Sequence, residues 1–324
     1  MIEYSSLKNS RISDKDWDDF VDQSDNGTIF HKRKFLSYHA KDKFNDASFV
    51  VFKDSNILSA MTAALIRRDN KLILSSHPGA SYGSFVYRSE LSLKEAHEIV
   101  ESLIDYGSEL NVDSIQLTLP PMIYQKKYSN YLDFALTQNG FSYLKREVSS
   151  VVQLDVEKEK LLYTFRPEAR TATKKAISSN VEIVETERFA EYYEILKKGL
   201  KMRHNVSPAH SLEELIRLKE LFPTKIRLWG AFVDGKLIAG VCNFNANNNV
   251  VLAFYISHLI EYQNYRPVNV LFYEIMHKSR EEGLKFLDFG IFTVNMEPNW
   301  GLARFKENFG ARGIFRDTFI KHLK

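Results

Sequence analysis

The sequence predicts a mixed α/β protein made of two similar domains, each with a central, mostly antiparallel sheet flanked by helices. The chain has 324 residues, which suits about two domains. The second half shows two helical patterns, three strands, a loop leading into a helix, and a further strand, and the first half follows this order more loosely. A repeat of roughly 150–200 residues indicates domain duplication rather than a solenoid.

Turn and helix signals define the elements of the second half. Asp234-Gly235 predicts a hairpin, because glycine readily adopts positive φ. Pro267 suits the first turn of a helix, and Gly283 suits its end. The predicted helices span residues 189–202, 212–221 and 267–282, and the predicted strands span residues 225–233, 236–244, 250–257 and 285–289.

The first half gives the same kinds of pattern with weaker boundaries. We expect the first domain to span residues 1–160 and the second to span residues 161–310, joined in the charged stretch 157–170, with residues 311–324 forming a strand that returns to the first domain. The predicted helices of the first half span residues 17–23, 30–39 and 91–110, and its predicted strands span residues 48–53, 57–66, 71–76, 85–87 and 114–119.

Composition limits the class of protein. The net charge of +3 gives no support to a polyanion binder, and Cys242, the single cysteine, excludes an intrachain disulfide and lies in an apolar run typical of the interior. The N-terminus lacks the apolar segment of a signal peptide, and no stretch approaches about 18 apolar residues. The histidines lack metal-ligand spacing. We therefore expect a cytoplasmic protein that has no metal and does not bind a membrane.

The most specific pattern lies near the end of the chain. An apolar strand ends in Asp288-Phe289-Gly290, and a short predicted helix follows with the pattern Gly-Leu-x-x-Phe-Lys-x-x-Phe-Gly. Leu302, Phe305 and Phe309 recur at intervals of three and four, which places them on one helical face. Lys306 sits beside this apolar row, so a packed helix holds its ammonium near a possible cleft.

This pattern, together with the order of elements, resembles the Fem-like aminoacyltransferases and their relatives, and most of all the bacterial sugar-nucleotide N-acyltransferases. These proteins contain two GNAT acyltransferase domains in one chain. The resemblance covers nearly the whole chain in order, but its specific residues lie mainly after Arg266. It implies tandem GNAT-like domains with a cleft between them, and direct attack of an amine on a thioester or ester carbonyl. No metal cofactor is implied.

The resemblance implies three candidate catalytic residues. Lys306 matches the lysine thought to steady the oxyanion of acyl transfer, and stabilisation of developing charge is often the largest catalytic contribution. Asp288 is a candidate proton acceptor for the attacking ammonium, and its alternative role is to anchor the loop through backbone N–H groups. His258 follows the third strand and is a candidate base, although a lone histidine is more often satisfied locally.

A second group of residues is expected to bind coenzyme A or acyl-CoA as a cosubstrate. In GNAT domains the loop before the long helix receives the pyrophosphate, and a helix N-terminus favours phosphate through its N–H groups and dipole. The candidates are Tyr265, Arg266 and Asn269, with Asn295 as a partner for the pantetheine amides. For Arg266 an ordinary surface position is an equally good interpretation.

The corresponding first-half loop, residues 77–83, lacks a basic, glycine-rich character, so we expect only the second domain to hold the donor. The first domain would then provide the acceptor side. In this interpretation Tyr82 stacks on a base or sugar and His77 binds a hydroxyl or phosphate. A turn over the sheet edge is an equal alternative. The candidate substrate-binding residues are His77, Ser81, Tyr82 and Gly83.

The resemblance leaves the donor open between acyl-CoA and aminoacyl-tRNA. The chain has no coiled-coil heptad arm and is not strongly basic, which favours acyl-CoA over tRNA. The predicted function is transfer of an acyl group from acyl-CoA to the amino group of an amino sugar, nucleotide-linked, in surface-polysaccharide assembly. The alternatives are an aminoacyl-tRNA-dependent peptidyltransferase of the peptidoglycan type, and a catalytically inactive module that binds a nucleotide or acyl-CoA.

Overall fold

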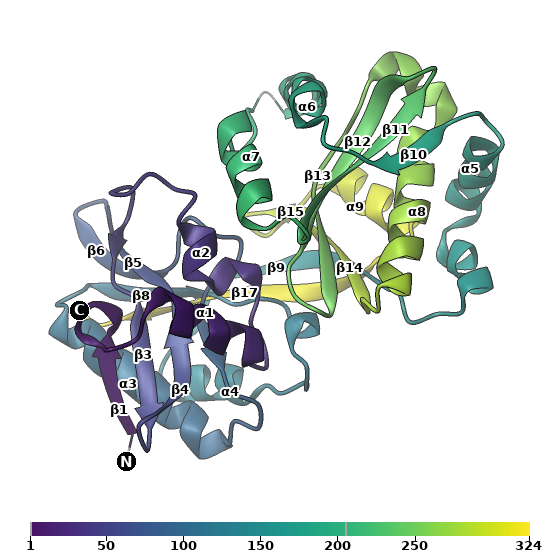
Figure 1. The fold of residues 1–324 in the computed structure, drawn as a ribbon. Helices are drawn as coiled ribbons and strands as arrows, with labels where there is room; N and C mark the ends of the chain where they lie inside the picture. Colours follow the sequence, from purple (N-terminus) through teal and green to yellow (C-terminus); the bar gives the residue numbers. More distant parts are fainter. Residues whose placement is uncertain (1, 205) are drawn as a thin grey trace. The chain divides into compact units, whose positions relative to one another are not determined.

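The structure, a computed structural model, describes residues 2–204 and 206–324, and its contacts divide the chain into two compact units (Figure 1). Unit 1 comprises Met1–Glu147 and Phe315–Lys324, and unit 2 comprises Val148–Ile314. The chain enters unit 2 within β9 (Ser142–Gln153) and returns within β17 (Arg312–His322). Residues 148–160, which we expected in the first domain, fall in unit 2 by this division because β9 pairs there with β14.

The described strands of unit 1 belong to two sheets. One has the order β1–β3–β4–β7, and the other has the order β17–β8–β6–β5–β2, in which β6 and β8 are parallel. The single strand predicted over residues 57–66 is wrong: it divides at Thr62, because its first part pairs with β3 and β7 and its second part with β2 and β6. The bounds are β1 (Ile2–Ser6), β2 (Asn45–Asp46), β3 (Phe49–Lys53), β4 (Asn56–Met61), β5 (Ala63–Arg68), β6 (Lys71–Ser76), β7 (Phe85–Tyr87) and β8 (Ser114–Thr118).

The long helix of unit 1, α3 (Leu93–Glu109), begins with a capping box between Ser92 and Glu95 and buries an apolar stripe in the core. The helix predicted over residues 30–39 is wrong in extent, because Lys32 has an extended backbone that separates two short turns. The remaining helical elements are η1 (Leu7–Asn9), α1 (Asp14–Gln23), η2 (Ile29–His31), α2 (Arg33–Leu36), η3 (Met122–Tyr124) and α4 (Tyr131–Gln138).

Unit 2 is built on a sheet with the order β10–β11–β12–β13–β14–β9, antiparallel except between β13 and β14. Asp234 and Gly235 form the predicted hairpin turn with φ values of 51° and 75°, which a type I′ turn requires. All four strands predicted here are present within two residues of their expected bounds. The bounds are β10 (Glu182–Glu185), β11 (Ile226–Val233), β12 (Lys236–Asn245), β13 (Val250–His258), β14 (Phe286–Ile291), β15 (Thr293–Val294) and β16 (Glu297–Pro298).

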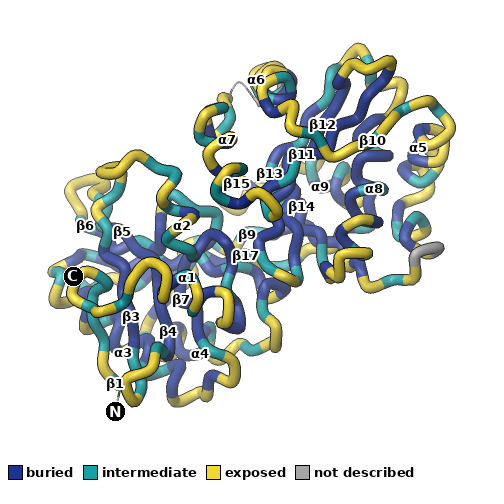
Figure 2. The backbone as a smooth tube through the Cα atoms, viewed as in Figure 1, coloured by how far each residue is buried: buried dark blue, intermediate teal, exposed yellow. Residues whose placement is uncertain are grey.

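Helices cover the sheet of unit 2, and α8 (Pro267–Glu281) packs on β11, β12 and β13. Its buried face includes Leu271, Ile275 and Met276, which join the strands in one apolar core; the strands of this unit form the dark interior in Figure 2. The mixed α/β fold with sheets flanked by helices is therefore confirmed. The other helical elements are η4 (Lys158–Thr164), α5 (Pro167–Ile177), α6 (Phe189–His204), α7 (Leu212–Leu221), η5 (Ile260–Tyr265) and α9 (Trp300–Asn308).

Candidate functional site

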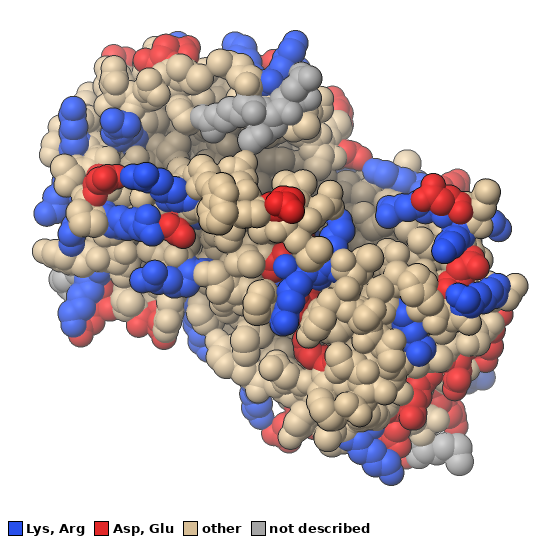
Figure 3. All heavy atoms as spheres, turned by 180° about the vertical axis from the view of Figure 1, so that it is seen from behind, with Lys and Arg blue, Asp and Glu red and all other residues tan. Residues whose placement is uncertain are grey.

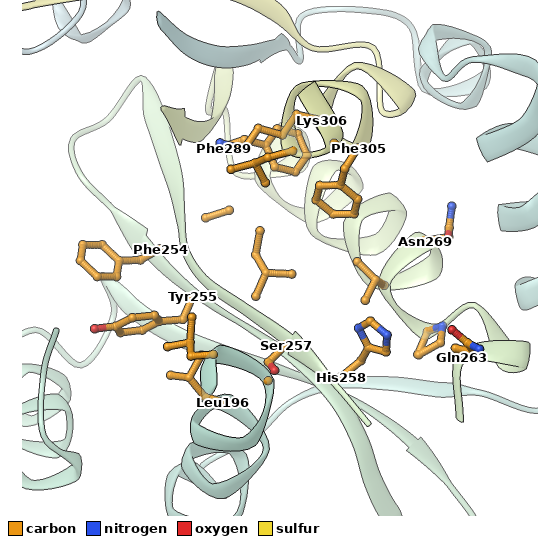
Figure 4. Close-up of a pocket in the computed structure, with 18 of the residues that line it drawn as sticks. Leu196, Phe254, Tyr255, Ser257, His258, Gln263, Asn269, Phe289, Phe305 and Lys306 are labelled. Carbon is orange, nitrogen blue, oxygen red and sulfur yellow. The ribbon is translucent and has the colours of Figure 1, made fainter. Parts of the chain in front are cut away.

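A cavity of about 720 Å³ lies in unit 2, where β13 and β14 part (Figure 4). The two strands pair from Val250–Phe286 to Leu252–Asp288 only. Beyond these pairs the cavity is lined by residues 253–258 of β13 and by the end of β14. Helices α6, α8 and α9 and the 3-10 turn η5 supply the remaining walls. This volume is within the range that holds a small ligand or cofactor.

One end of the cavity is the N-terminus of α8. Pro267 occupies the first turn, and Arg266 before it has left-handed backbone angles of φ 52° and ψ 44°. This conformation is uncommon for a residue with a Cβ, and such backbone strain clusters at ligand sites. Gln263, Arg266 and Asn269 all line the cavity here. The helix dipole and the guanidinium together favour an anion such as a phosphate.

The Lys306 side chain reaches the cavity from α9 and is almost fully buried, with 3% exposed. Its Nζ donates to the carbonyl oxygens of Gly290 and Ile291, both at 2.7 Å. Burial lowers the pKa of Lys306 from 10.5 to about 8, against the opposing influence of Asp288. An ammonium has three N–H donors, so two carbonyls leave one for a group in the cavity. Lys306 is thus packed into the interior, which its place beside the apolar row did not predict.

Asp288 is completely buried on β14 and shapes the strand rather than facing the cavity. Its Oδ1 accepts hydrogen bonds from the Ser149 hydroxyl at 2.6 Å and from the Gly290 backbone N–H at 2.7 Å. It is not among the described residues that line the cavity. This geometry corresponds to the loop-anchoring role, and it argues against direct proton transfer from a bound amine to Asp288.

Asp288 and Lys306 together hold a bulge at the end of β14. The pairing with β9 is irregular between Asp288 and Ile291, and Gly290 has φ 71°, a value that glycine adopts without cost from a Cβ. The Asp288 carboxylate accepts a hydrogen bond from the N–H of Gly290, while the Lys306 ammonium donates to the carbonyls of Gly290 and Ile291. The bulge therefore fixes the position of a buried cation beside the cavity.

The structure brings some of the other expected donor residues to the cavity and not others. His258 lines it at the end of β13, close to Gln263 and Asn269 in Figure 4. Tyr265 and Asn295 are exposed and are not among the described lining residues. Asn295 lies in the two-residue turn between β15 and β16, where its φ is 50°.

In unit 1, the residues expected to bind the acceptor do not form one site. His77 lines a separate pocket of about 350 Å³ with Arg33, Asp46 and His39, and burial lowers its pKa to about 4. Tyr82 is only 2% exposed, and its hydroxyl lies 3.2 Å from that of Tyr124. This burial argues against stacking of the Tyr82 ring on a ligand.

The other two candidate residues of this loop, Ser81 and Gly83, make their contacts through backbone carbonyl groups. The Ser81 carbonyl accepts a hydrogen bond from Arg316 at 2.6 Å, and the Gly83 carbonyl lies 2.8 Å from Nε2 of His31. A Cβ on Gly83 would come within 2.7 Å of Ser76, so a close approach requires this glycine. His77 is therefore the member of the loop whose side chain opens onto a pocket.

Several residues that shape the cavity were not among the candidates from the sequence. Ser149 fixes Asp288 from β9, a strand that the sequence patterns did not predict. Phe254 and Gln263 line opposite ends of the cavity in Figure 4, and Leu196 lines it from α6. The predicted strand over residues 250–257 carried the only available signal for Phe254, since a strand beside a binding loop contributes alternate side chains to its walls.

The described part of the chain contains neither a cluster of metal ligands nor a membrane-spanning helix. Over residues 2–204 and 206–324, no group of three or more His, Cys, Asp or Glu side chains could hold a metal ion. No helix in the described part of the chain is both long and apolar enough to cross a bilayer. On the face shown in Figure 3, basic and acidic side chains are interspersed, in keeping with the small net charge.

Comparison with known proteins defines the class of the second unit. Residues 160–307 match the family described as an acetyltransferase (GNAT) domain. Unit 2, with its parting strands and its cavity at the N-terminus of α8, therefore contains a GNAT acetyltransferase domain. A search of curated proteins gave no match.

Solved structures resemble the whole chain. The chain is similar to FemX, with 12% identity and a TM-score of 0.76 over 99% of this chain and 97% of that one. It is similar to a tandem GNAT protein from the clavulanic acid biosynthesis pathway, with 11% identity and a TM-score of 0.53 over 99% and 98%. L-PGS from Bacillus licheniformis matches with 11% identity and a TM-score of 0.56 over 88% and 90%. At these identities the similarity shows the fold, which is tandem GNAT-like.

Proposed function

We propose that the chain is an N-acyltransferase that takes an acyl group from acyl-coenzyme A and transfers it to the amine of a small molecule. The cavity of unit 2 carries this proposal. It begins at the N-terminus of α8, follows the edge of β13 where the pairing with β14 has ended, and includes the buried Lys306. These features follow the order of the parts of a coenzyme A thioester, namely phosphates, pantetheine amides and reacting carbonyl.

The donor would bind through charge at one end and backbone groups along its length. Arg266 and the first turn of α8 suit the pyrophosphate, and Asn269 and Gln263 line the same end. A strand edge beyond its last pairing offers N–H and C=O groups in a row, which suit the two pantetheine amides. Tyr265 and Asn295 lie outside the described lining, so they would contact the donor only from the rim.

The chemistry follows from the position of Lys306. The acceptor amine attacks the thioester carbonyl, and the remaining N–H of Lys306 donates to the oxygen as it becomes negative. The C–N bond forms, the C–S bond breaks, and the sulfur leaves as coenzyme A. The proton lost by the amine passes to His258 or to water and then to the leaving thiolate. Holding both substrates together supplies a further large part of the rate.

For the acceptor, we propose the amino group of an amino sugar carried on a nucleotide, as used in surface-polysaccharide assembly. This part rests on the resemblance of the sequence to the sugar-nucleotide N-acyltransferases. His77 and its pocket in unit 1 are the acceptor contacts to test, because this imidazole lies at a pocket that also contains Arg33 and Asp46.

A second candidate is a peptidyltransferase that takes an amino acid from aminoacyl-tRNA. The fold of FemX, which matches nearly the whole chain, is compatible with this candidate. This fold fits either donor equally well, so the donor must be tested directly.

The test is a matched donor screen with the full chain. A panel of acyl-CoA thioesters is mixed with UDP- and dTDP-linked amino sugars, and free thiol is measured together with the mass of the sugar product. Parallel reactions contain tRNA charged with radiolabelled amino acids. Thiol release that depends on the amino sugar supports the proposal. Transfer from charged tRNA alone would establish the second candidate, and binding of coenzyme A without turnover would indicate an inactive module.

A further inference from the structure

The charged and polar side chains that line the cavity limit the kind of acyl group that it accepts. This inference rests on the proposed function. The end of the cavity away from α8 is the place for that group. In Figure 4, His258, Gln263 and Asn269 gather at one end, whereas Phe254 lies at the other. Phe254 precedes His258 by four residues, about 13 Å along an extended strand.

Apolar side chains from several elements line the cavity. Leu196 and Leu200 come from α6, Phe254 from β13, and Leu302 and Phe305 from α9. Phe254 stacks on Phe244 with ring centroids 4.4 Å apart, so its ring is held as a firm wall. Such a surface gains free energy by covering an apolar tail.

Several polar side chains of the cavity lining already have partners within the protein. The Ser257 hydroxyl donates to the Ile195 carbonyl at 3.1 Å, and Asn299 Oδ1 accepts from the backbone of Leu302 at 3.0 Å. Lys306 uses the carbonyls of Gly290 and Ile291, which would otherwise be acceptors at the edge of β14. A polar acyl tail beside these groups would therefore compete with hydrogen bonds that they already make.

The charges of the lining have one sign. Arg266 and Lys306 line the cavity, and none of its described lining residues is Asp or Glu. Asp288 lies close to Lys306, but it is fully buried and accepts from Ser149 and Gly290. An aminoacyl group carries an ammonium on the carbon next to the reacting carbonyl. In this cavity that ammonium would meet another cation and find no carboxylate, which is unfavourable for a buried charge.

We propose that the acyl group transferred by this protein is uncharged and apolar, an alkanoyl chain rather than an aminoacyl group. The positive lining and the occupied polar groups reject a cationic tail, and the walls formed by Phe254, Leu196 and Leu302 hold the alkyl chain. The same features separate the two donors considered above, because every aminoacyl-tRNA presents an α-ammonium and an alkanoyl-CoA does not.

The test measures binding, so that it needs no acceptor. The ligands are coenzyme A, S-hexyl-CoA and S-(6-aminohexyl)-CoA, titrated into the full chain by calorimetry at pH 7. The two thioethers match in length and differ in the terminal ammonium. We expect S-hexyl-CoA to bind at least about ten-fold more tightly than S-(6-aminohexyl)-CoA, since a buried unpaired charge is strongly disfavoured. Equal binding, or tighter binding of the aminohexyl compound, would overturn the inference and leave the proposed acyltransferase intact.

A variant with an added carboxylate should weaken or reverse the preference for S-hexyl-CoA over S-(6-aminohexyl)-CoA. Leu302→Glu places a carboxylate in the first turn of α9, where the helix dipole favours an acid and where Leu302 is only half-buried. It should bring the two thioethers to within about three-fold of each other or favour the aminohexyl compound. Trp300→Glu adds the same charge to the same turn at a side chain that is 76% exposed and outside the cavity lining, and it should keep the preference of the unmodified protein.

Two further outcomes would overturn the inference. If Trp300→Glu changes the preference as much as Leu302→Glu does, the selectivity comes from general charge and the assignment of the cavity end is wrong. If coenzyme A itself does not bind, the proposed donor is refuted and the inference falls with it.

Discussion

At the scale of single residues, Lys306 is the clearest test of catalysis. Lys306→Met keeps the aliphatic stem and removes the charge, so kcat should fall by about a hundred-fold or more while the Kd for coenzyme A changes little. Because the variant leaves the carbonyls of Gly290 and Ile291 without their donor, the free energy of unfolding should fall by about 1–2 kcal/mol. Thiol release, calorimetry and chemical denaturation measure the three quantities.

The control for this variant is Lys278→Met on α8, an exposed lysine that pairs with Glu281 on the same helix. It should leave kcat unchanged and shift the unfolding free energy by no more than about 0.5 kcal/mol. A near-normal kcat for Lys306→Met would show that this lysine serves only to hold the bulge.

The pKa of Lys306, about 8, also predicts a pH dependence. If the charged form acts on the oxyanion, kcat is full below pH 8 and falls as the pH rises through that value. Stability behaves differently: the folded pKa lies below the ordinary 10.5, so the unfolded chain binds more protons between these values. Stability from this group therefore rises with pH across that window. A pH–rate profile to pH 9.5 tests the prediction, and a flat profile would contradict it; in Lys306→Arg the descending limb should disappear.

At the scale of elements, the sequence predicted regular structure well and the site geometry poorly. Strands β11 to β14 and helices α6 to α8 could be predicted from local periodicity and from turn and helix-start signals such as Asp234-Gly235 and Pro267. The division of the first-half strand at Thr62 and the strand β9 depend on long-range pairing, which periodicity does not report. The motif around Lys306 was found from its pattern. The burial of Lys306 could not be predicted from that pattern, because the bulge at Gly290 forms only when β9 and α9 pack against β14.

The bulge of β14 gives a prediction with a matched control. Gly290→Ala forces a residue with a Cβ to φ 71° and should cost about 1 kcal/mol, although the Cβ itself meets open space. Gly283→Ala at the end of α8, with φ 84° and equally open surroundings, should cost a similar amount. Only Gly290→Ala should also lower kcat, by about ten-fold or more, because it moves the carbonyls that hold Lys306. Equal kcat values for the two variants would contradict a role for the bulge in catalysis.

The N-terminus of α8 should carry the affinity for the donor phosphates. Arg266→Gly removes the guanidinium but suits the left-handed backbone at this position, so the helix keeps its N–H groups in place. We expect the Kd for coenzyme A to rise by about ten-fold or more, since a charge-assisted hydrogen bond is lost. Arg266→Lys, which retains the charge, should show a smaller rise by calorimetry. An unchanged Kd in Arg266→Gly would place the phosphates elsewhere.

At the scale of the whole molecule, the two units have different expected roles although both belong to one tandem fold. The cavity, the helix N-terminus and the buried lysine all lie in unit 2, which contains the GNAT acetyltransferase domain. Unit 1 has its own pocket at His77, with two carboxylates, Asp14 and Asp46, beside Arg33. Arg33 and Lys41 balance these two carboxylates, whereas the cavity of unit 2 has Arg266 at the α8 end and no Asp or Glu in its described lining, so the donor should bind in unit 2 alone.

Hydrogen exchange on the full chain tests this division of roles. The full chain is required because unit 1 is discontinuous and includes Phe315–Lys324, so cutting the chain between the units would remove β17 from β8. Saturating coenzyme A should slow exchange in peptides that cover residues 253–258 and 266–271, because the ligand shields these amides and stabilises the strand edge and the helix start. Peptides over residues 77–83 should exchange as before. Protection at residues 77–83 with none at residues 266–271 would place the donor in unit 1 and reverse the roles of the two units.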